Sequence, residues 1–92
     1  MKKNLLDPAD DDFCTVLICA VRYCIGRQTY MPSLVIGFIT PLLPNIEEWA
    51  LRVMRSDIAM ADYLGDKAID EPLWLTFWQN IEKEIKRREH DR

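Results

Sequence analysis

The sequence has few residues of the kinds that bind metals or build disulfide frameworks. It contains one histidine, His90, and three cysteines, Cys14, Cys19 and Cys24, each five residues from the next. A step of five turns a helix by about 140°, so these thiols point in different directions and cannot pair within one helix. No Cys-x-x-Cys or Cys/His cluster is present to bind zinc. We therefore expect no cofactor, and free thiols among apolar neighbours suit a reducing cytosol.

Long hydrophobic runs are also missing. The two apolar stretches, 13–21 and 34–43, are too short to cross a bilayer, and Pro41 interrupts the second. Lys2 and Lys3 do not begin a signal peptide, because four aspartates follow where its apolar stretch should lie. These features predict a cytoplasmic protein that does not contact a membrane.

Size and charge fit one globular domain without general affinity for nucleic acid. The chain has 92 residues, and 49% of them are hydrophobic, which is too many for a disordered segment. Its net charge of −3 gives no long-range attraction to nucleic acid or anionic lipid. Direct nucleic-acid binding is therefore not expected. The length predicts a single domain over 1–92, with 1–6 and 89–92 as frayed ends.

The first half of the chain predicts two helices. Asp7, followed by proline, is typical of an N-cap, and Gly26 is typical of the end of the same helix. A second helix follows and should break near Thr40, because Pro41 lacks an amide donor. The β-branched residues of 34–39 leave a strand open as the alternative for this segment.

The second half also predicts two helices. Residues 45–48 are a close match to a capping box, which opens a helix over 46–64. The last helix begins at 70 or 71 and carries apolar residues at spacings of three and four. The fold class is therefore all-α, a compact single domain of about four helices. The side chains expected inside it include Leu17, Val21, Phe38, Val53, Trp74 and Trp78.

Acidic residues are concentrated in the third expected helix and the loop after it. Residues 44–71 contain seven acidic and three basic side chains. Glu47, Glu48 and Asp57 would give this helix an exposed acidic face. No nucleophile or metal ligand lies near them in sequence, so we interpret them as solvated or partner-binding side chains rather than as acid/base pairs. Such a face could meet a basic nucleic-acid channel on a partner, where complementary charge speeds encounter.

A second polar cluster spans 22–32, with the sequence RYCIGRQTYMP. Arg22, Arg27 and Tyr30 surround the expected end of one helix and the start of the next. Arginine offers a planar fork for a carboxylate or phosphate, and a helix start offers free amides, so this cluster could bind an anion or a partner. The same residues could instead cap the first helix and hold the connector against the core. Both interpretations remain open.

The pattern R-Y-x-x-G-R-x-T-Y-M-P at 22–32 resembles a group of short proteins encoded by phages and prophages of Gram-positive bacteria. In that group an apolar helix rich in Cys and Ala leads into the motif, and a variable acidic helix follows it. The resemblance covers about 11–85, and its specific part is the eleven-residue motif. The group has no established activity, so the resemblance implies a context, a phage accessory protein inside a bacterial cell, and no catalytic residue.

These features favour a non-enzymatic phage accessory protein that binds and inhibits a host protein. The partner expected from this context is a nucleic-acid-handling defence enzyme, a nuclease of the CRISPR type, which would make the chain anti-CRISPR-like. The alternative is a small DNA-binding phage regulator, which needs a basic recognition helix, but acidic residues interleave the bases of 82–89. An enzyme using the 22–32 motif as an anion site ranks third, and a homodimer is left open. The candidate partner-binding residues are Glu47, Glu48, Asp57, Arg22, Arg27 and Tyr30.

Overall fold

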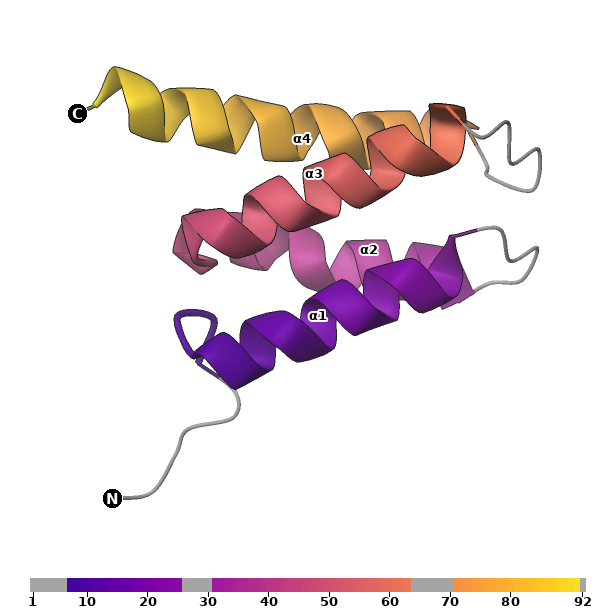
Figure 1. Cartoon of the computed structure of the whole chain (residues 1–92), viewed down its shortest axis with the longest axis horizontal. Helices are drawn as coiled ribbons and strands as arrows, with labels where there is room; N and C mark the ends of the chain where they lie inside the picture. The colour runs from indigo at the N-terminus through magenta and orange to yellow at the C-terminus, as the bar shows by residue number, and fades with distance from the viewer. Residues whose placement is uncertain (1–6, 26–30, 64–70, 92) are drawn as a thin grey trace.

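The computed structural model describes residues 7–25, 31–63 and 71–91, and within these ranges it contains helices and no strand (Figure 1). The elements are α1 (Asp11–Cys24), α2 (Met31–Ile39), the 3-10 helix η1 (Thr40–Asn45), α3 (Glu48–Tyr63) and α4 (Glu71–His90). The expected all-α domain of about four helices is confirmed. The strand alternative for 34–39 is wrong, because this segment lies within α2.

The helices form a layer with one helix behind it (Figure 1). α1, α3 and α4 lie side by side, and α2 lies behind α1 and α3. α1 packs against both α2 and α3, α3 packs against α4, and η1 packs against α4. Successive helices run in opposite directions, so the starts of α1 and α3 lie at the same end of the molecule.

α1 begins three residues later than a cap at Asp7 would place it. The Asp10 carboxylate accepts hydrogen bonds from the amides of Asp12 and Phe13 at 2.9 and 3.1 Å, which makes Asp10 the N-cap. The Asp7 carboxylate instead accepts from the amide of Ala9 at 2.9 Å, and its carbonyl accepts from the amide of Asp10. Asp7 therefore closes a turn before the helix. The predicted stop at Gly26 lies outside the described residues.

The proline-rich segment after α2 interrupts the helix as predicted. α2 ends at Ile39, and the chain continues as η1 through Pro41 and Pro44. The Thr40 hydroxyl donates to the carbonyl of Ile36 at 2.7 Å, which satisfies an acceptor in the last turn of α2. The break therefore redirects the chain without unravelling the end of the helix.

Both ends of the α3–α4 pair differ from the expected bounds. α3 begins at Glu48 rather than at 46, and the carbonyl of Glu47 accepts from the amide of Leu51, so Glu47 takes the place expected for Asn45. Asn45 ends η1 instead, so the capping box predicted for 45–48 is wrong. α4 continues to His90, so 89 and 90 are helical although fraying was expected there. Residues 1–6 and 92 lie outside the described part.

One hydrophobic core joins all the helices. Leu17, Val21 and Trp74 are buried as expected, and Val53 and Trp78 are partly buried against the same core. The expectation for Phe38 is wrong, because 58% of this residue is exposed. A nine-residue helix buries one side, and in α2 the core-facing positions are Pro32, Ile36 and Ile39.

The three cysteines are free thiols, as the sequence predicts. Cys14 and Cys24 are buried in the core, which fits the expectation that they behave as small apolar residues. Cys19 is exposed on the outer side of α1, so that expectation is wrong for this residue. The difference follows from the spacing of five, which turns Cys19 away from the side that carries Cys14.

Candidate docking surfaces

Arg22 and Asp57 belong to two clusters that are separate in the sequence, and the structure brings them into contact. The Arg22 guanidinium on α1 binds the Asp57 carboxylate on α3, with Nε 2.7 Å from Oδ2 and Nη2 3.4 Å from Oδ1. The hydrogen bond to Asp57, followed by the charge of Asp57, raises the pKa of Arg22. The Asp57 side chain is 20% exposed. These two residues thus link α1 to α3, and Arg27 and Tyr30 of the same cluster lie outside the described residues.

Glu48, Arg52 and Arg55 of α3 also form ion pairs within the chain. Glu48 binds Arg52 one turn later at 3.2 Å, and Arg52 reaches Glu89 of α4 at 2.9 Å. Arg55 of α3 forms an ion pair with Glu82 of α4. The predicted acidic face on this helix is therefore largely neutralised, because Glu48 and Asp57 already have arginine partners.

Glu47 lies in a different environment, at the end of the molecule where α1 and α3 both begin. It is exposed, and its backbone hydrogen-bonds the thiol of Cys14 on α1. The indole Nε1 of Trp49 donates to Asp11 Oδ1 at 3.2 Å across the same junction, and this tryptophan is 41% exposed. We call this group, made of Asp10, Asp11, Glu47 and Trp49, the acidic end.

The charges of the acidic end act on Cys14 beneath it. Burial, and after it the negative charges of Glu47, Asp11 and Asp10, raise the pKa of the Cys14 thiol, while its hydrogen bond to the Glu47 backbone opposes the shift. The segments 7–21 and 44–51 contain no lysine, arginine or histidine. The sequence does not indicate this surface, because the aspartates of 7–12 lie far in sequence from Glu47 and Trp49, and aspartates at a helix start are already explained by the helix dipole.

A second exposed surface is apolar and lies on the α1–α2 pair. Val16 and Tyr23, seven residues apart, share one side of α1, and Met31, Leu34 and Phe38 share one side of α2. All five are exposed by more than a third. We call these five residues the apolar face.

The members of the apolar face are turned away from the residues that contact α3 or the core. On α1, Tyr23 is turned by about 100° from Arg22, the residue that contacts α3. On α2, Leu34 and Phe38 are each turned by about 160° from Ile36, which lies in the core. α1 and α2 pack against each other and run antiparallel, so the two stripes lie on neighbouring helices of one pair (Figure 1).

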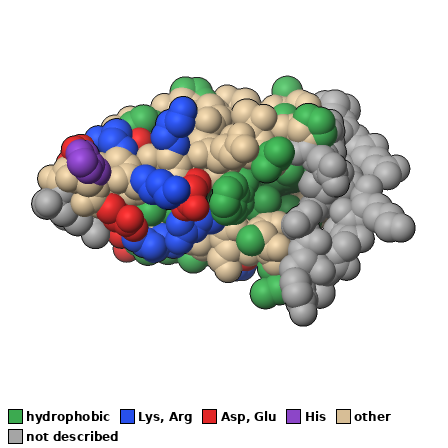
Figure 2. Space-filling model, turned by 90° about the horizontal axis from the view of Figure 1, so that it is seen from above, with side chains coloured by type: hydrophobic (Ala, Val, Ile, Leu, Met, Phe, Trp, Pro, Cys, Tyr) green, Lys and Arg blue, Asp and Glu red, His purple; other side chains and the backbone are tan. Residues whose placement is uncertain are grey.

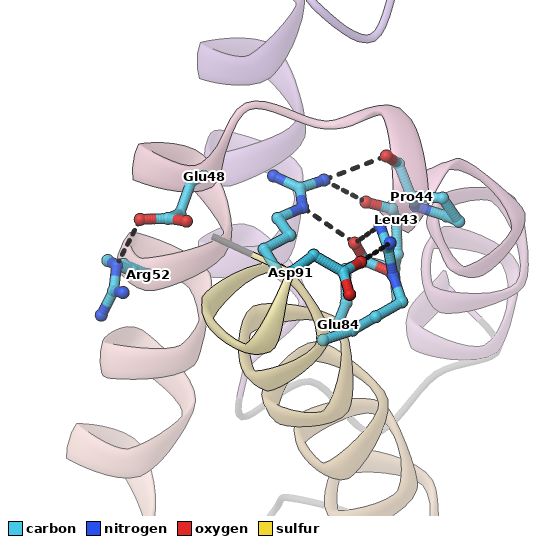
Figure 3. Close-up of polar contacts among 8 residues, drawn as sticks. Leu43, Pro44, Glu48, Arg52, Glu84 and Asp91 are labelled. Carbon is cyan, nitrogen blue, oxygen red and sulfur yellow. Dashed lines mark hydrogen bonds and ion pairs between the residues drawn. The ribbon is translucent and has the colours of Figure 1, made fainter.

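Two arginines of α4 are held by a buried glutamate. Glu84 binds the Arg87 guanidinium at 2.6 Å and Arg88 Nε at 2.8 Å (Figure 3). Arg88 Nη2 donates in turn to the carbonyls of Leu43 and Pro44 in η1, at 3.0 and 3.1 Å (Figure 3). We call Glu84, Arg87 and Arg88 the clamp, because they tie α4 to η1.

The two arginines of the clamp favour the charged form of Glu84. The hydrogen bond from Arg87 is the main cause that lowers the pKa of Glu84, burial opposes it, and the hydrogen bond from Arg88 adds to the lowering. Glu84 and Arg88 are one helical turn apart on α4, a spacing at which opposite charges pair. Seen over α4, basic and acidic side chains alternate toward the histidine end, and hydrophobic side chains take over toward the other end (Figure 2).

Within the ranges that the structure describes, no group of three or more His, Cys, Asp and Glu side chains could hold a metal ion. Across the same ranges, every helix is too short or too polar to traverse a bilayer. No protein-family model matches the chain, and neither a curated protein nor a solved structure matches it.

Proposed function

We propose that this chain is a non-enzymatic binding protein that inhibits a partner protein by docking through its acidic end. The observation that carries the proposal is the position of Glu47. It is exposed beside Asp11 and the half-exposed Trp49, whereas Glu48 and Asp57 are bound to arginines of the same chain. The acidic end, and not the whole of α3, is then the surface that offers negative charge to a partner.

The chemistry of the acidic end favours a basic partner surface. The carboxylates of the acidic end lie in segments, 7–21 and 44–51, that contain no basic residue, and such a group attracts a positive partner over long distances and speeds its encounter. Trp49 adds a large side chain that can be buried on contact, and tryptophan is enriched among the residues that dominate binding energy. A basic nucleic-acid channel has the complementary charge. The resemblance of 22–32 to phage proteins makes a host defence nuclease of the CRISPR type the partner that we propose.

The alternative, a DNA-binding regulator, has less support. Such a protein needs guanidinium and ammonium groups that can reach phosphates. Arg87 and Arg88 of α4 bind Glu84, and Arg52 and Arg55 of α3 bind carboxylates as well. Lys83 and Lys86 are exposed, but two lysines neutralise few phosphates, and the arginines of the same helix are already bound to Glu84.

The test measures DNA cleavage by a purified, guide-loaded nuclease of the CRISPR type with increasing amounts of this protein. We expect Glu47→Lys to raise the concentration needed for half-inhibition by at least about tenfold, because it replaces attraction by repulsion at a close charge pair. The carbonyl of Glu47 bonds α3, but its side chain is exposed, so the variant should fold.

Asp57→Lys is the matched control, because it makes the same change in net charge further along α3, away from the acidic end, where Asp57 pairs with Arg22. Circular dichroism checks that both variants are helical. The proposal is contradicted if Glu47→Lys inhibits as well as the original protein, or if both variants lose inhibition equally. An original protein that neither binds nor inhibits the nuclease would contradict the proposed partner.

A further inference from the structure

α2 has an unusual composition for a helix at the surface. None of its nine residues is charged, and its outer side carries Met31, Leu34 and Phe38. A helix that is apolar on every side is normally buried, because its outer side gains nothing from water. Within this chain only one side of α2 faces the core. We therefore expect another molecule to contact the outer side of α2, because no described residue of this chain buries it.

The size of the apolar face fits the centre of an ordinary interface. A large apolar side chain has a surface of about 150–250 Å², so five that are more than a third exposed present on the order of 400 Å². A standard interface takes about 800 Å² from each partner and is roughly 60% apolar at its core. The apolar face supplies most of that apolar part on one subunit.

The charges near the face disfavour a membrane as its cover. A helix that lies on a bilayer surface carries lysine and arginine along the edges of its apolar side. In the described part of α1 and α2 the only basic residue is Arg22, and it is bound to Asp57. The described rim of the apolar face therefore lacks the free basic side chains that attract anionic lipid.

The same charges favour a second copy of this chain. A two-fold interface brings the same patch of both subunits together, so a patch with net charge would repel itself. The apolar face has no charged member, so two copies can meet there without like-charge repulsion. The antiparallel α1–α2 pair of one copy would pack against that of the other as a four-helix arrangement, the common way in which paired helices bury apolar stripes.

We propose that the apolar face binds a second copy of this chain and that the protein is a symmetric dimer. The interface is formed by Val16 and Tyr23 of α1 with Met31, Leu34 and Phe38 of α2. It is separate from Glu47 and Trp49 of the acidic end, so the dimer does not depend on the function proposed above.

Sedimentation velocity from about 1 to 100 μM tests the proposal, because interfaces of this size with moderate affinity assemble in that range. We expect the full chain to sediment as a dimer at the upper concentrations. Phe38→Glu should weaken association at least about tenfold, since it buries a carboxylate in the interface. Val16→Glu on α1 should do the same, which provides a second variant should the first fail to fold.

Leu75→Glu is the matched control. Leu75 is 54% exposed on α4, close to the 58% of Phe38, but it lies outside the apolar face. We expect this variant to remain a dimer. A chain that is monomeric at every concentration overturns the proposal, and so does a Leu75→Glu variant that dissociates as much as Phe38→Glu. Monomeric protein that binds vesicles of phosphatidylcholine and phosphatidylserine would replace the second copy by a membrane.

Discussion

The α1–α2 pair and the α3–α4 pair differ in the side chains that they present at their outer surfaces. On the α3–α4 pair, Arg52 and Arg55 of one helix bind glutamates of the other, and the clamp ties α4 to η1. On the α1–α2 pair, residues 13–43 contain two charged side chains, and large apolar residues face outward. The described arginines of α3 and α4 find their acidic partners within the chain. The α1–α2 surface is left for another molecule to cover.

The largest expected effect is on the free energy of unfolding, and it should differ between two phenylalanines. Phe77 of α4 is almost completely buried, whereas Phe38 of α2 is exposed. Phe77→Ala should lower the free energy of unfolding by about 3–5 kcal/mol, because it removes buried surface and leaves a cavity. Phe38→Ala should change it by less than about 1 kcal/mol in dilute protein, where no second copy covers it. Urea denaturation at low micromolar concentration measures both values, and equal losses would break the comparison.

The clamp predicts a pH-dependent effect. Replacing Glu84 by Gln should cost about 1–3 kcal/mol at pH 7, since it leaves Arg87 and Arg88 without their buried carboxylate. The pKa of Glu84 is lower in the folded protein, so its contribution is complete above its unfolded pKa of about 4.3 and is lost as the pH falls through the folded value. The difference between the original protein and Glu84→Gln should therefore shrink in acid.

Glu89→Gln is the control for the clamp. Its side chain is half exposed and binds Arg52 at the surface, so the cost should stay below about 1 kcal/mol. Chemical denaturation at pH 7 and at pH 3 gives the four values that are needed. A cost for Glu84→Gln that is the same at both pH values would show that the carboxylate charge does not stabilise the clamp.

Helical periodicity was enough to predict the fold class and much of the core. Apolar residues at spacings of three and four identified Trp74 on α4, and Pro41 marked the break after α2. Phe38 was misplaced because α2 is apolar all round, so its sequence has no polar side to mark the outside. Periodicity shows which side of a helix faces the core only where the opposite side is polar.

The candidate site was harder to predict because its contacts link distant residues. Arg22 and Asp57 are 35 positions apart, and nothing in the sequence shows which of several carboxylates a given guanidinium will meet. The acidic end is hard to predict for the same reason, since Trp49 reaches Asp11 only because α1 and α3 start at the same end of the molecule. Local patterns predict helices, whereas the pairing of surface charges depends on how those helices pack.

A smaller effect concerns the glycine of α2. Gly37 is exposed within the helix, and a Cβ at this position would meet nothing within 4 Å. Gly37→Ala should therefore raise the free energy of unfolding of dilute protein by about 0.5–1 kcal/mol, because alanine loses less backbone entropy in a helix. Thermal denaturation measures the change. A lower melting temperature would contradict the prediction, because it would mean that the added methyl group meets a neighbour on the outer side of α2.

The smallest effect leaves stability unchanged and compares the two sides of α1. Cys19 on the outer side is exposed, whereas Cys14 and Cys24 are buried, and the pKa of Cys14 is raised. Since the thiolate is the reactive form, iodoacetamide should modify Cys19 first and the other two only after denaturation. Mass spectrometry of peptides after timed alkylation checks the order. Modification of Cys14 as fast as Cys19 in folded protein would contradict the packing of α1 against the core.

The claim that another molecule covers the α1–α2 surface is tested most directly by side-chain footprinting. Hydroxyl radicals modify exposed side chains, and the labelling of each peptide can be compared between dilute and concentrated protein. We predict that Tyr23, Leu34 and Phe38 become protected as the concentration rises, while Met60 and Leu75, which are equally exposed on the other helix pair, react as before. Labelling of the apolar face that does not change with concentration, or protection that is equal on both helix pairs, would contradict the account.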